Sequence, residues 1–94
     1  MESRFRGLVE KEIDNMVSLD SIDKWIAYSE FFPLNTVEDF CFGVIVGFIL
    51  TASMAIARTL YGRDATEEEM KEVMNIIERR TMEIRGNIKL ATSK

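Results

Sequence analysis

Histidine is absent from this chain of 94 residues, and cysteine, proline and tryptophan each occur only once. The lack of histidine removes the commonest general base and the commonest ligand for transition metals. The single cysteine, Cys41, rules out a disulfide within the chain and favours a reducing compartment. With one proline and five glycines, long stretches run uninterrupted, which favours helices over a turn-rich β architecture. We therefore expect an all-α, non-catalytic protein with no cofactor and no metal.

The charge balance is mildly acidic, with 16 acidic and 12 basic side chains and a net charge of −4. An acidic surface argues against general nucleic-acid binding, which depends on neutralising phosphates. The first residues, MESRFRGLVEKEID, carry charges where a secretion signal needs an apolar stretch, so the sequence predicts no such signal. The length suits one domain near the lower limit of what folds alone. We expect one cytoplasmic domain spanning residues 1–94.

Four helices are predicted, at about residues 4–17, 21–32, 37–61 and 66–86. In the first, apolar residues recur at spacings of three and four, which gives one apolar stripe on a charged helix. The second can be capped by Asp20 or Ser21, and Pro33 ends it because the residue before proline avoids the α region.

The third predicted helix begins after Thr36, whose hydroxyl can accept from a first-turn amide, and Gly62 suits its end. The fourth begins with Thr66 and has a glutamate three residues later, which is the pattern of a capping box. The pair Gly86-Asn87 is expected to end or loosen this helix. Four such helices predict a small, bundle-like domain.

The third helix contains the most informative segment, FCFGVIVGFILTASMAIA at residues 40–57, which has no charged side chain. A helix that is apolar on every side is either a membrane span or is surrounded by protein. Three other short helices are too little protein to cover it completely. The sequence therefore predicts a fully apolar central helix whose burial is completed by a partner, with a two-fold dimer as the commonest solution.

Four small residues at four-residue spacing, Gly43, Gly47, Thr51 and Ala55, form a stripe along this helix. Such a stripe lets two helix backbones approach closely, in lipid or in a soluble assembly. We expect self-association through it. The alternative is that the glycines only make room for neighbouring phenylalanines.

The fourth helix adds a heptad-like seam and an uneven charge distribution. Its acidic first half and basic second half would be complementary if two copies lay antiparallel, although the same distribution also suits the helix dipole. The seam residues expected to take part in self-association are Met70, Met74, Ile77 and Ile84. The basic residues that form a candidate patch for an anionic partner are Arg79, Arg80, Arg85 and Lys89.

These observations predict a small, non-catalytic helical protein that self-associates and serves as an interaction or scaffold module, with itself or another helical protein as partner. One alternative is a single-span membrane protein anchored by residues 40–57, because 18 residues at a rise of about 1.5 Å match the hydrocarbon thickness. A remote alternative is a Mg²⁺-dependent nucleotide hydrolase that uses Glu69 and Glu72, which share a helix face.

Overall fold

The computed structural model describes residues 3–93 and contains five α-helices and no strand within that range. The fold is therefore all-α, as predicted. The helices are α1 (Ser3–Met16), α2 (Leu19–Ser29), α3 (Val37–Tyr61), α4 (Glu67–Arg79) and α5 (Thr81–Thr92).

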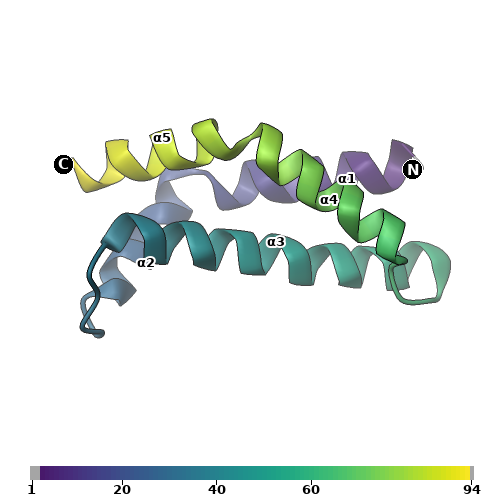
Figure 1. The fold of residues 1–94 in the computed structure, drawn as a ribbon, viewed down its shortest axis with the longest axis horizontal. Helices are drawn as coiled ribbons and strands as arrows, with labels where there is room; N and C mark the ends of the chain where they lie inside the picture. Colours follow the sequence, from purple (N-terminus) through teal and green to yellow (C-terminus); the bar gives the residue numbers. More distant parts are fainter. Residues whose placement is uncertain (1–2, 94) are drawn as a thin grey trace.

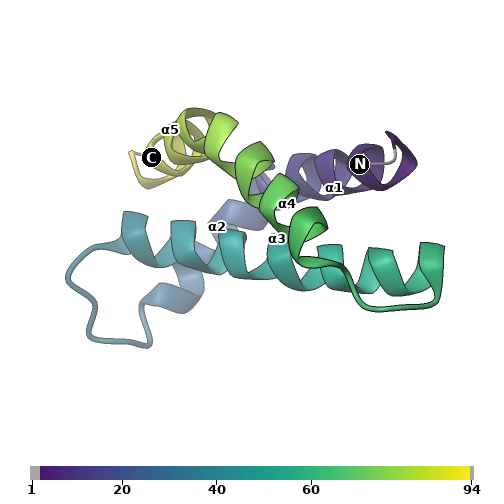
Figure 2. The same ribbon diagram turned by 45° about the vertical axis from the view of Figure 1, so that its right-hand side comes forward.

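Helix α3 forms one layer of an elongated molecule about 40 Å long. Helices α1, α4 and α5 lie along one side of α3 and run antiparallel to it, while α2 lies beside its N-terminal half (Figure 1). In the turned view, α4 and α5 form one bent rod above α3 (Figure 2). Along the C-terminal half of α3, the side that faces away from this rod has no helix over it in either view, while α2 lies beside the N-terminal half.

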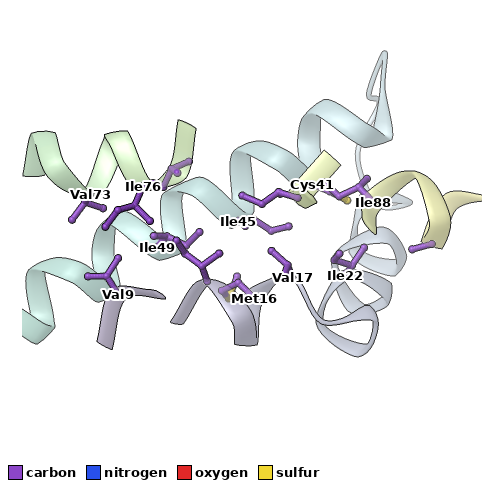
Figure 3. Packing of buried hydrophobic residues seen from close by; sticks show 14 of the residues in the cluster. Val9, Met16, Val17, Ile22, Cys41, Ile45, Ile49, Val73, Ile76 and Ile88 are labelled. Atoms are coloured by element: carbon purple, nitrogen blue, oxygen red, sulfur yellow. The ribbon is translucent and has the colours of Figure 1, made fainter. Parts of the chain in front are cut away.

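The core lies between α3 and the helices above it. Residues at four-residue spacing on α3 are buried, among them Cys41, Ile45 and Ile49, and Val9 and Val73 pack around them from α1 and α4 (Figure 3). Burial raises the pKa of the Cys41 thiol, which keeps it protonated and unreactive. Only one face of α3 is thus covered by the chain itself.

The predicted fourth helix, at residues 66–86, is wrong as a single element because it is broken at Arg80. The backbone there leaves the helical region, with φ −102° and ψ 6°. Its guanidinium bonds to Glu10 and Asp14 of α1 at 3.1 and 2.7 Å, and to Glu83 of α5. This ion cluster fixes the bend. The break could not be predicted from the local helix pattern, because two of the partners of Arg80 lie on α1, far away in the sequence. The four-helix count was one too few for the same reason.

Gly86 and Asn87 lie within α5, so they do not end the helix as expected. The Asn87 side chain instead donates to the carbonyl oxygen of Val17 at 2.9 Å, which ties α5 to the end of α1. Asn87, which suggested a helix end, therefore makes a contact between helices inside a continuous α5.

The helix ends confirm part of the predicted capping. Thr66 and Glu69 form the capping box at the start of α4, and Gly62 ends α3 with a φ of 65°, a left-handed conformation that suits glycine. Two caps were predicted wrongly. Ser18 caps α2 in place of Asp20 or Ser21, and Thr36 makes no capping hydrogen bond to a first-turn amide.

Candidate functional site

The open face of α3 is the main candidate site. Within residues 3–93, α3 is the one helix long and apolar enough to cross a membrane, and only 28% of its most apolar window is buried. A core helix of a soluble protein is normally covered much more completely. The open face therefore exposes apolar side chains, and Phe48 and Met54 are each half exposed.

The small-residue stripe lies on this open face. Gly43, Gly47, Thr51 and Ala55 are all exposed, opposite the buried residues of α3. The Thr51 hydroxyl donates to the carbonyl oxygen of Gly47 at 3.0 Å, so the one polar side chain of the stripe is satisfied within the helix. The stripe therefore presents an apolar surface of low relief.

The packing of a single chain does not require these glycines. A methyl group placed on Gly43 or Gly47 would meet nothing within 4 Å beyond the adjacent residues and the backbone of its own helix. Glycine inside a helix is about 1 kcal/mol less favourable than alanine. The alternative that the glycines make room for phenylalanines on neighbouring turns thus has no contact to support it.

A hollow of about 460 Å³ adjoins the stripe near the N-terminal end of α3. We call it the aromatic hollow, and its lining residues are Trp25, Tyr28, Phe31, Phe32, Phe40, Val44 and Phe48. Val44 and Phe48 also line a hollow of about 420 Å³ over the glycines, so the two surfaces are continuous. The sequence did not reveal the aromatic hollow, because α2, the loop after it and α3 supply its lining from separate parts of the chain.

The aromatic hollow is poorly covered by the chain itself. Phe31 is 81% exposed and Phe32 is 56% exposed. The Trp25 ring lies 5.1 Å from that of Phe48, and its buried indole N–H has no hydrogen-bond partner among the described residues. Buried N–H groups nearly always have a partner, so the unpaired indole of Trp25 is an exception in this structure.

The seam residues that were predicted to self-associate differ in their exposure. Ile77 and Ile84 are 3% and 0% exposed and belong to the core of the single chain. Neither is available to a second copy. Met70 is partly buried, and Met74 is half exposed beside a small hollow that Phe42 and Val46 also line.

The predicted basic patch is largely engaged within the chain. Arg80 serves the ion cluster, and Arg85 bonds to Glu38 and Asp39 at 3.2 and 3.1 Å. The Arg85 guanidinium, with help from the Thr36 side chain, lowers the pKa of the Asp39 carboxyl. Arg79 and Lys89 are exposed, so two of the four predicted residues face solvent and two are held by carboxylates of the chain.

Glu69 and Glu72, which were considered as metal ligands, form ion pairs with arginine side chains of the same chain. Glu69 accepts from Arg63 at 2.9 Å and from the Thr66 amide at 2.8 Å, and these bonds lower its pKa to about 2. Glu72 pairs with Arg6 of α1 at 2.9 Å. Residues 3–93 contain no group of three or more acidic or cysteine side chains placed to hold a metal ion.

Comparison with protein-family models, with curated proteins and with solved structures gives no match for this chain. The candidate function therefore depends on the geometry of the open face.

Proposed function

We propose that this protein self-associates through the open face of α3 and acts as an interaction or scaffold module. The observation that supports the proposal most strongly is the pair of exposed glycines, Gly43 and Gly47, on an apolar face where the single chain has no use for them. Contiguous exposed apolar surface commonly marks an interaction site on a protein. A second helix on the stripe would bury it and give the glycines a function.

Replacing Gly47 with leucine tests the proposal directly. The new side chain would point into open space in a single chain, so the monomer should fold with unchanged helix content. It would fill the stripe and exclude a partner helix, so the mass measured by light scattering should fall to that of one chain.

The matched control is Gly47→Ala, which keeps the stripe low and should leave the assembly intact. If Gly47→Leu keeps the mass of the unmodified protein, the open face of α3 is not the contact.

The membrane span is a second candidate, favoured by the length and low burial of α3. The charged helices weigh against it, because α1, α4 and α5 lie along α3 and carry the Arg6–Glu72 and Arg80 ion pairs (Figure 1). If α3 spanned a bilayer in this fold, those charges would lie at the depth of the hydrocarbon, which is costly.

A carbonate wash of cell membranes distinguishes the two candidates. The self-association proposal predicts that the chain is recovered in the soluble fraction. Retention in the membrane pellet would instead support a span.

A further inference from the structure

Six residues of the open face of α3 are spaced symmetrically about position 49. Along this face Phe40, Val44, Gly47, Thr51, Met54 and Arg58 follow one another at spacings of 4, 3, 4, 3 and 4, and each is at least partly exposed. This order of spacings is the same in both directions along the helix. Two copies that cross antiparallel at position 49 therefore place Gly47 against Thr51, Val44 against Met54 and Phe40 against Arg58.

We propose that the occupant of the open face is a second copy of this chain, with its α3 antiparallel to the first and the two-fold axis at position 49. This inference rests on the proposed function and adds the orientation of the partner and its register. The alternating four- and three-residue spacing is the one through which helices pack along their length.

The charges at the two ends of α3 favour the antiparallel orientation. The side chains of Asp39 and Arg58 are 68% and 71% exposed. A parallel pair would set each beside its own copy, like charge against like, whereas the antiparallel pair sets Arg58 of one copy near Asp39 of the other. Both residues keep ion pairs within their own chain, to Arg85 and Asp64, so the effect is on orientation more than on affinity.

The antiparallel register also completes the aromatic hollow. It brings Met54 and Arg58 of the second copy to Val44 and Phe40, at the wall of the hollow. A thioether and a guanidinium are the groups that pack favourably on aromatic rings. Within the chain, Arg85 already lies 4.2 Å over the Phe42 ring and Arg63 lies 4.7 Å over Tyr61. Each aromatic hollow would thus be closed by the other copy.

Cysteine cross-linking tests the orientation. In a Cys41→Ala background, cysteines are placed at Val44, at Met54, or at both. In an antiparallel pair, two copies of position 44 lie about 15 Å apart, as do two copies of position 54, and a disulfide spans at most about 7 Å between Cα atoms. The double variant should therefore form covalent dimers under mild oxidation, and neither single variant should.

The other outcomes separate the inference from the proposal on which it rests. Covalent dimers of either single variant would mean a parallel pair, and no cross-link in a protein with the mass of two chains would mean another face. Both overturn the inference and leave self-association standing. A monomeric chain would overturn both, and its binding to phosphatidylcholine vesicles would assign the open face to lipid.

Discussion

At the scale of single residues, Arg80 links three helices through its ion pairs. Only 18% of its side chain is exposed, and it joins α1, α4 and α5 through three carboxylates. Glu83, Asp14 and Glu10 raise the pKa of the guanidinium, while the guanidinium lowers the pKa of the Glu83 carboxyl. In the sequence Arg80 is one of several neighbouring basic residues, and its partners on α1 become visible only in the fold.

Replacing Arg80 with methionine should lower the free energy of unfolding at pH 7 by about 1–3 kcal/mol, because three carboxylates lose a shared, partly buried partner. The Glu83 pKa is depressed in the folded state, so this stabilisation is full above the ordinary value of 4.5 and is lost as pH falls through the folded value. The difference between variant and parent should therefore shrink at pH 3. Urea unfolding at both pH values measures it.

Arg79→Met is the matched control for this substitution, since Arg79 is exposed and adjacent. It should change the unfolding free energy by less than about 0.5 kcal/mol. Equal effects of the two substitutions would contradict the role assigned to Arg80.

At the scale of helices, the sequence predicted those helix ends that depend on neighbouring residues alone. The bounds of α3 follow from its apolar run and Gly62, and the start of α4 follows from its capping box. The break at Arg80 could not be predicted, because its cause lies in carboxylates about 70 residues earlier in the chain.

The open face of α3 was predictable only in part. An apolar run shows that a helix needs cover, and the small-residue stripe indicates a close contact. Which face the chain covers depends on how α1, α4 and α5 pack, and that packing left the stripe exposed. The aromatic hollow needed the fold as well, since α2 and α3 supply its walls from separate parts of the sequence.

At the scale of the whole molecule, the chain covers α3 unevenly, with the buried residues of α3 on one face and the small-residue stripe exposed on the other. Charged helices lie along one side of α3 (Figures 1 and 2). The stripe lies on the opposite face of α3, and the aromatic hollow adjoins it. A second copy on that side would bury α3 between two layers of helices and leave the charged surfaces in water. Two-fold dimers are by far the commonest oligomers of soluble proteins.

The most direct test is the mass in solution of the unmodified protein, measured by light scattering after purification without detergent. The account predicts a discrete assembly of two chains that stays soluble. A stable monomer, or a chain that stays in solution only with detergent, would contradict it.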